Sequence, residues 1–409
     1  MKQHRLKINK QEVLYFLLLI PFFEPGCIGS FIEYNINTSL YNAIGTVFAL
    51  GRYLVSCIGF ILFIKEFTSR KNSTSTLFNL LIVITLFSTL SNIINKTSLN
   101  AILSGVYEIG FICICETLAS KGYKKFIHVQ LALLGVLSFL GVTSILIFPH
   151  GFNHAKYTFF AIYFLGSKNA SINIYIIFIL AYLGYQYEKN KKLSIKGLII
   201  LTLFLITGFL TESGSTIVCL IILMAYYALR IVSFDKFSIR PWIPFAGVAF
   251  AIVVIYIGTN FNFINSIVTT LGRDLSFSGR TALWDDALSY FRSSPIFGVG
   301  IEAKFHNYSG VIQHSAHSQY LDRLAKYGII AFILFIVVII RTEKKLCIAK
   351  NRNIASVFGL IYTVYILKMG FDTYDFKLLI MVIYLIEEII ATIDGTVIRN
   401  KKNVFLKKY

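Results

Sequence analysis

Charged side chains are scarce in this sequence. Asp, Glu, Lys and Arg make up 14% of its 409 residues, and hydrophobic residues make up 56%. A soluble domain has roughly 25% charged and about 45–50% apolar residues. The shortage of charge therefore excludes an ordinary soluble protein and indicates an integral membrane protein.

Several common site signatures are also missing. No two of the six cysteines have the spacing of zinc ligands, and together they show no disulfide framework. No P-loop, dinucleotide-binding or nuclease motif is present. The net charge of +19 would suggest nucleic acid in a soluble protein, but here the basic residues lie mostly in short segments between apolar runs. We therefore expect no metal, no cofactor and no nucleic-acid partner.

The chain does contain apolar segments that suit a membrane. A transmembrane helix needs roughly 20 apolar residues, or about 17 where it is tilted or the bilayer is thin. By this measure the sequence predicts an all-α polytopic fold with about twelve transmembrane helices. The predicted spans are 13–32, 44–64, 77–95, 99–119, 126–148, 160–187, 197–211, 215–232, 241–259, 327–340, 354–370 and 378–394.

The distribution of Lys and Arg gives the orientation. With twelve spans both termini lie on one side, and 27 of the 39 Lys and Arg residues fall on that side against 10 on the other. Cytoplasmic loops carry the excess of basic residues. We therefore expect both termini to be cytoplasmic.

One connection on the outer side, residues 260–326, is far longer than the others. Loops beyond roughly 15 residues are usually functional or disordered. The sequence therefore predicts three parts. Residues 1–259 hold transmembrane helices one to nine, residues 260–326 form a large extracytoplasmic loop, and residues 327–409 hold the last three helices and a basic cytoplasmic tail.

The long loop shows helical patterns of its own. One buried helix face is indicated by residues with i, i+3, i+4, i+7 spacing, namely Trp284, Ala287, Leu288 and Phe291. Pro295 is expected to end this helix. A second short helix is expected to begin near Ser315, a plausible N-cap, and to continue into the span at 327–340.

Arg280 lies beside Gly279 at the expected start of the first of these helices. A guanidinium next to free backbone N–H groups suits an anion such as a phosphate. The alternative interpretation is a solvated helix end.

His317 is predicted to lie in the first turn of the second helix, on one stripe with Tyr320, Leu321 and Leu324. The helix dipole disfavours a positive charge there. A neutral imidazole in this place can accept a proton near neutral pH. The alternatives are a core histidine hydrogen-bonded to the loop, or a metal ligand together with His314.

Arg52 lies in the middle of a predicted span. A charge in that environment is expensive and tends to face a cavity or a partner, and Glu24 in the first span is a candidate partner. A structural ion pair and a ligand site are both consistent with this pattern. Charges within spans also serve proton relays, so a proton-coupled transporter is a further alternative.

In combination, the loop residues resemble a known signature. The stretch GRTALWDDALSYFRSSPIFGVG, followed after a spacer by AHSQYLDRLAKYGIIAF, resembles that of the O-antigen ligase and polymerase superfamily. Its members are bacterial polytopic proteins that handle polysaccharides on undecaprenyl diphosphate. The twelve predicted spans and the single large outer loop are also similar. The matching residues are Gly279, Arg280, Trp284, Pro295, Gly298, Gly300, Ala316, His317, Tyr320, Leu321 and Gly328.

The sequence departs from the family pattern in two places. Ser318 stands where the family usually has Asn. Many members also carry a Ser-Arg pair in an earlier outer turn, and the corresponding stretch here, LTESGSTIV, contains no Arg. Arg52 or Arg273 is then a candidate for the missing phosphate contact. The stretch SKNASINIY resembles a further family motif and singles out Asn169.

The resemblance implies a metal-independent glycosyltransferase with a polyprenyl-diphosphate-linked glycan donor, in the bacterial inner (cytoplasmic) membrane. We expect a repeat-unit polymerase for O-antigen or capsule, with a chain-length regulator and a flippase as partners. The alternatives are a ligase of the same superfamily and a transporter of lipid-linked sugar. His317 and Arg280 are the expected catalytic residues. The expected substrate-binding residues are Arg273, Arg52, Trp284, Asn169 and Tyr320.

The predicted orientation can be tested with a cysteine placed at position 310. A membrane-impermeant thiol reagent should label it in cells whose cytoplasmic membrane is intact, because residues 260–326 are expected on the outer side. Labelling that requires permeabilisation of that membrane would contradict the topology.

Overall fold

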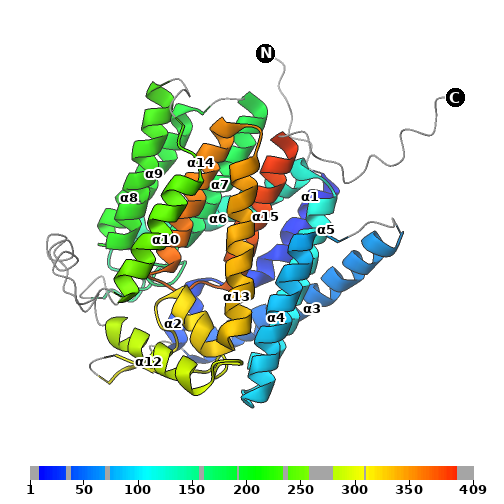
Figure 1. The fold of residues 1–409 in the computed structure, drawn as a ribbon, viewed down its shortest axis with the longest axis vertical. Coiled ribbons are helices and arrows are strands. Elements are labelled where there is room, and N and C mark those ends of the chain that lie inside the picture. The colour runs from blue at the N-terminus through cyan, green and yellow to red at the C-terminus, as the bar shows by residue number, and fades with distance from the viewer. Residues whose placement is uncertain are drawn as a thin grey trace. The chain divides into compact units, whose positions relative to one another are not determined.

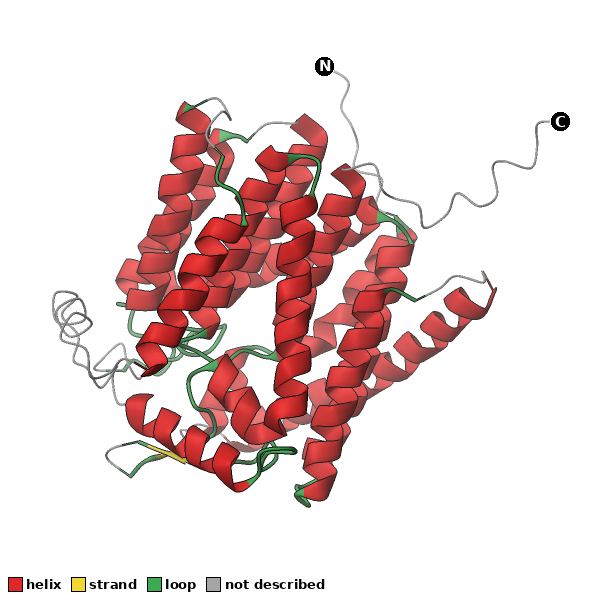
Figure 2. Cartoon of the chain, viewed as in Figure 1, coloured by secondary structure: helices red, strands yellow, loops and turns green. Residues whose placement is uncertain are grey.

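The structure, a computed structural model, describes residues 9–33, 38–69, 74–155, 161–190, 193–233, 238–257, 280–307 and 310–393. Within them, helices dominate and the strands are two residues long (Figure 1 and Figure 2). Seven of the described helical segments are long and apolar enough to cross a membrane, and three shorter apolar helices accompany them. The predicted all-α polytopic membrane fold is confirmed.

The chain forms two compact units, and it passes from one to the other within α5 and within α15. The first unit consists of residues 1–75, 110–237 and 380–409, and the second of residues 76–109 and 238–379. The elements of the first unit are α1 (Lys10–Leu19), η1 (Ile20–Phe22), α2 (Gly26–Glu33), α3 (Thr38–Ser69), the second half of α5 (Leu99–Ser120), α6 (Tyr123–Ile147), α7 (Ser171–Asn190), α8 (Ile195–Leu210), α9 (Gly214–Val232) and most of α15 (Phe376–Ile393). Those of the second are α4 (Thr76–Ile94), α10 (Trp242–Ile257), α12 (Arg280–Ser293), β1 (Phe305–His306), β2 (Ile312–Gln313), α13 (Gln319–Ile348) and α14 (Arg352–Met369).

Each of the twelve predicted spans overlaps a helix, with two corrections. The first span is not one continuous helix, because Pro21 lies in η1 and Pro25 directly precedes α2, and neither proline has the N–H that a continuous helix needs. The span expected from residue 160 begins only at Ser171. Before it, Tyr163 and Gly166 hydrogen-bond to each other in a tight turn, so this apolar stretch is not helical.

The second helix of the long loop also differs from the prediction. Ser318, and not Ser315, is the N-cap, because its backbone is extended and its side chain accepts a hydrogen bond from the N–H of Leu321. The helix then runs through the predicted span but contains a break at Gly328, where φ is 75°. His317 therefore precedes the helix instead of lying in its first turn.

The segment that follows α12, Pro295–Gly300, hydrogen-bonds to the backbone on both sides of the break in α13. The N–H groups of Val299 and Gly300 donate to the carbonyls of Ala325 and Lys326 at 3.0 and 2.9 Å. The N–H of Ile329 donates to the carbonyl of Pro295 at 2.8 Å. The Pro295–Gly300 segment thus satisfies backbone groups on both sides of the break.

Polar side chains of α4 hold this junction, and Figure 1 shows α4 beside α13. The Ser91 hydroxyl donates to the Lys326 carbonyl at 2.9 Å and also bonds to the Phe297 carbonyl. Asn92 accepts from the N–H of Ile301, and Asn95 donates to the carbonyl of Gly298. The Pro295–Gly300 segment, called the motif segment below, is therefore held by both α4 and α13.

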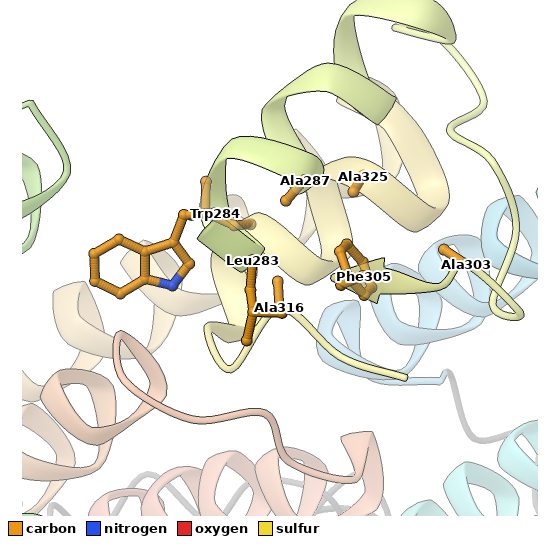
Figure 3. Close-up of a cluster of buried hydrophobic side chains, with 8 residues drawn as sticks. Leu283, Trp284, Ala287, Ala303, Phe305, Ala316 and Ala325 are labelled. Carbon is orange, nitrogen blue, oxygen red and sulfur yellow. The ribbon is translucent and has the colours of Figure 1, made fainter. Parts of the chain in front are cut away.

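The helix α12 packs on the same region through the face that its sequence predicted. Trp284 and Ala287 are buried and Leu288 is partly buried. Figure 3 shows the cluster that they join. Its buried members are Leu283, Trp284, Ala287, Ala303, Phe305, Ala316, Leu321 and Ala325.

We predict that Gly328→Ala destabilises the protein strongly. A Cβ at this position would lie 2.1 Å from the carbonyl oxygen of Ile296, in addition to the strain of a positive φ. Gly122→Ala is a matched control, because Gly122 also has a positive φ but nothing lies within 4 Å of its Cβ position. The control should cost roughly 1–3 kcal/mol from backbone strain alone. Equal shifts of the thermal midpoint in detergent for the two variants would contradict the proposed steric clash.

Candidate functional site

Arg280 is the first residue of α12, as its sequence context predicted. It is half-buried, and its charge acts on Asp372, which lies in the turn between α14 and α15. The structure therefore places a guanidinium at a helix N-terminus within electrostatic reach of a buried carboxylate. Gly279 and Arg273 lie outside the described residues.

His317 is held just before α13 by an unusual backbone conformation. Its φ is 48°, in the left-handed region that a residue other than glycine rarely adopts. The side chain is 36% exposed, but Nδ1 is buried and has no hydrogen-bond partner. Oδ1 of Asp372 lies 3.7 Å from this nitrogen. The imidazole therefore has one enclosed nitrogen and one accessible side.

Asp372 is the residue of this site that sequence reasoning missed. Its Oδ2 accepts a hydrogen bond from the Nζ of buried Lys368 at 3.0 Å, and its Oδ1 accepts one from the N–H of Thr373 at 3.1 Å. Lys368 lies near the end of the predicted span 354–370. The available signal was the i, i+4 spacing of Lys368 and Asp372 at the end of an apolar run.

The surrounding charges determine the protonation of Asp372. Burial acts to raise the pKa of its carboxyl, and the charge of Lys368 acts against burial. His317 and Arg280 add to the effect of Lys368, so that the pKa lies well below its ordinary value. The carboxylate is therefore ionised at neutral pH.

Backbone and amide hydrogen bonds hold the Asp372 turn against the start of α13. The N–H of Gln319 donates to the Asp372 carbonyl at 3.1 Å, and the Gln319 side chain accepts from the N–H of Tyr374 at 2.6 Å. The Tyr320 hydroxyl donates to the Ile366 carbonyl of α14 at 3.0 Å. These contacts keep Asp372 beside His317 although the two residues are far apart in the sequence.

The segment before His317 is fixed from the other side of α13. The Asp322 carboxylate accepts from the N–H of Ala316 at 3.0 Å and pairs with Lys326 at 3.0 Å. Lys326 also donates to the His314 carbonyl at 2.8 Å. The segment that carries His314 is thus held mainly through its backbone. Among the described residues, no group of three or more His, Cys, Asp and Glu side chains could hold a metal ion.

Trp284 and Tyr320 lie in the second unit with Arg280 and His317. Trp284 is buried, and Figure 3 shows its ring directed away from Ala287 and Phe305. The hydroxyl of Tyr320 is already bonded to α14. A direct contact of either residue with substrate stays a prediction.

Arg52 and Asn169 belong to the first unit. Arg52 forms the expected ion pair with Glu24, at 3.0 Å, next to the broken first span. Asn169 accepts a hydrogen bond from the hydroxyl of Ser213 at 2.8 Å. The two stretches SKNASINIY and LTESGSTIV are therefore in contact, although the roles of Arg52 and Asn169 in substrate binding stay predictions.

Comparison with known families agrees with this arrangement. Residues 199–336 match the family described as O-antigen ligase. A search of curated proteins found no match. The matched region includes Arg280 and His317 but ends before Lys368 and Asp372.

Members of this family are glycosyltransferase-like enzymes that act on lipid-linked glycans. The matched region also contains the P-x-x-G-x-G segment and the break in α13 that the segment fills. Residues 199–336 thus match the O-antigen ligase family, and this match supports the resemblance of the chain to the O-antigen ligase and polymerase superfamily.

Proposed function

We propose that this protein is a polysaccharide repeat-unit polymerase of the bacterial cytoplasmic membrane. It transfers a growing glycan from undecaprenyl diphosphate to the next lipid-linked repeat unit of an O-antigen or capsule. The observation that supports this most directly is that the family match contains both Arg280, at the start of α12, and His317, whose Nδ1 lies 3.7 Å from buried Asp372.

In the proposed reaction, a hydroxyl of the acceptor sugar attacks the anomeric carbon of the donor glycan. The new bond joins that oxygen to the anomeric carbon, and the bond from the anomeric carbon to the diphosphate oxygen breaks. The electron pair leaves with the lipid diphosphate, and the hydroxyl proton must be taken up by a base. The two requirements are therefore a cation for the leaving group and a base for the acceptor.

Arg280 fits the first requirement. Its guanidinium lies at the N-terminus of α12, where backbone N–H groups also favour an anion. A fixed positive charge stabilises the negative charge that develops on the diphosphate without the need for a metal ion. Arg280 is therefore the proposed contact for the departing diphosphate.

His317 fits the second requirement. Its imidazole is half-buried, one nitrogen is enclosed beside an ionised carboxylate, and the other side is accessible. A neutral imidazole in this setting can accept the proton of the acceptor hydroxyl. The proton then resides on His317 until it is released after transfer.

The products of purified protein incubated with lipid-linked repeat units test the proposal. A ladder of longer lipid-linked glycans supports a polymerase. Transfer of the glycan to a different acceptor would identify a ligase, the activity that the family description names. Movement of the lipid-linked sugar across a vesicle membrane without any new bond would identify a transporter.

We predict that Arg280→Ala lowers the transfer rate by roughly 10²–10³-fold, the usual effect of removing one group that stabilises developing charge. Arg280→Lys keeps the charge but loses the bidentate geometry, so it should also be impaired. Arg292→Ala is a matched control, because it removes an exposed arginine from the last turn of the same helix. Wild-type polymer length and amount in Arg280→Ala cells at equal expression would refute the assignment.

We predict that His317→Gln slows transfer by roughly 10²–10⁴-fold, because glutamine can hydrogen-bond but cannot act as a base. His306→Gln is the control, since His306 pairs with Asp286 on an exposed strand of the same loop. Near-normal turnover in a well-folded His317→Gln protein would exclude His317 as the base and indicate an orienting or structural role.

A further inference from the structure

We propose that Asp372 is a positioning residue that holds His317 as the tautomer with a proton on Nδ1, and that buried Lys368 keeps Asp372 in the form that does so. The catalytic meaning of this arrangement rests on the proposed function. The arrangement itself is a property of the folded second unit and can be measured without substrate.

The surroundings of the buried nitrogen of His317 favour one tautomer of the imidazole. A neutral imidazole has one nitrogen that donates and one that accepts, and the partner of one nitrogen decides which is which. Nδ1 is enclosed and faces Asp372 at 3.7 Å. An ionised carboxylate only accepts hydrogen bonds. A proton on Nδ1 can therefore point at Asp372, and Nε2 is left with the lone pair that a base needs.

The distance of 3.7 Å is longer than a hydrogen bond. Hydrogen bonds between catalytic groups are often long without substrate and tighten when it binds. The opposite tautomer would place the lone pair of Nδ1 against a carboxylate, and two acceptors repel each other. The chemistry of the pair therefore favours the proton on Nδ1 even at this separation.

Buried Lys368 keeps the carboxylate of Asp372 ionised. Its side chain is 1% exposed, and its Nζ lies 3.0 Å from Oδ2 of Asp372. A buried carboxylate without a cation tends to take up a proton. A protonated Asp372 could donate to Nδ1 and would favour the opposite tautomer of His317. The buried lysine prevents this by keeping the carboxylate ionised.

The other charges around the pair act in the same sense. Arg280 of α12 is the further cation whose field reaches Asp372. The N–H of Thr373 donates to Oδ1, the oxygen that faces His317. Asp372 therefore has a fixed orientation, with one oxygen directed to Lys368 and the other to the imidazole.

The direct test is ¹⁵N NMR of histidine-labelled full-length protein in lipid nanodiscs at a pH where the imidazoles are neutral. The His317 signals are assigned by their loss in His317→Gln. We expect the wild-type His317 to carry its proton on Nδ1 and Asp372→Asn to shift the population toward the Nε2-protonated form. Asp375→Asn is the matched control, because Asp375 lies in the same turn but pairs with Lys377. An Nε2-protonated wild type, or an unchanged tautomer in Asp372→Asn, would overturn the proposal.

Transfer kinetics supply the second arm. Asp372→Asn should lower turnover by roughly 10²-fold or more, because the imidazole loses the group that fixes its tautomer. Asp375→Asn should leave turnover unchanged. Where Asp372→Asn folds poorly, the double variant Asp372→Asn, Lys368→Met removes both charges together and should show the same tautomer shift. A normal tautomer and normal turnover in that folded double variant would likewise overturn the proposal.

The two arms separate this inference from the proposed function. A wild-type protein that transfers no glycan, but whose His317 tautomer depends on Asp372, would refute the polymerase proposal and leave the positioning role intact. An Asp372→Asn protein that polymerises normally and keeps its His317 tautomer would refute the positioning role and leave the polymerase proposal intact.

Discussion

The backbone hydrogen bonds between the Pro295–Gly300 segment and the two halves of α13 are the interaction on which the candidate site depends. A break in a helix leaves N–H and C=O groups without partners, and inside a membrane protein such groups must be satisfied by other protein atoms. The motif segment meets this requirement with its own backbone. Glycine at 328 allows the chain to turn there and lets the segment approach closely. The break in α13 at Gly328 and the position of the Pro295–Gly300 segment therefore depend on each other.

This junction also explains why the site lies where it does. With α13 interrupted at Gly328, the residues before the break form a short platform that carries Gln319 and Tyr320. These two residues hold the turn after α14, and that turn brings Asp372 to His317. On the other side, the packing of α12 against the same platform fixes its N-terminal residue, Arg280. Three parts of the chain that are separate in the sequence thus each contribute one side chain to the site, namely Arg280, His317 and Asp372.

Local patterns in the sequence were sufficient for the helices and for the face that α12 buries, because helical spacing is set by residues within two turns. They were also sufficient for Arg280 at the start of α12. They failed at Ser315, since a serine with equal capping chemistry stands three residues later at 318. They could not reveal Asp372 beside His317, because the hydrogen bonds that bring them together connect residues 46 to 55 positions apart. The break at Gly328 was hidden for the same reason, as the partner backbone comes from another segment.

The polar side chains of α4 have a consequence for biosynthesis. Ser91, Asn92 and Asn95 bond to residues that follow them by 203 to 235 positions. Chains are made from the N-terminus, so α4 is inserted long before these partners exist. Until then its hydroxyl and amide groups must find temporary partners in water, lipid headgroups or other proteins. The end of α4 is therefore a place where an incomplete chain differs chemically from the finished one, and where quality control in the membrane could recognise a protein whose site has not yet formed.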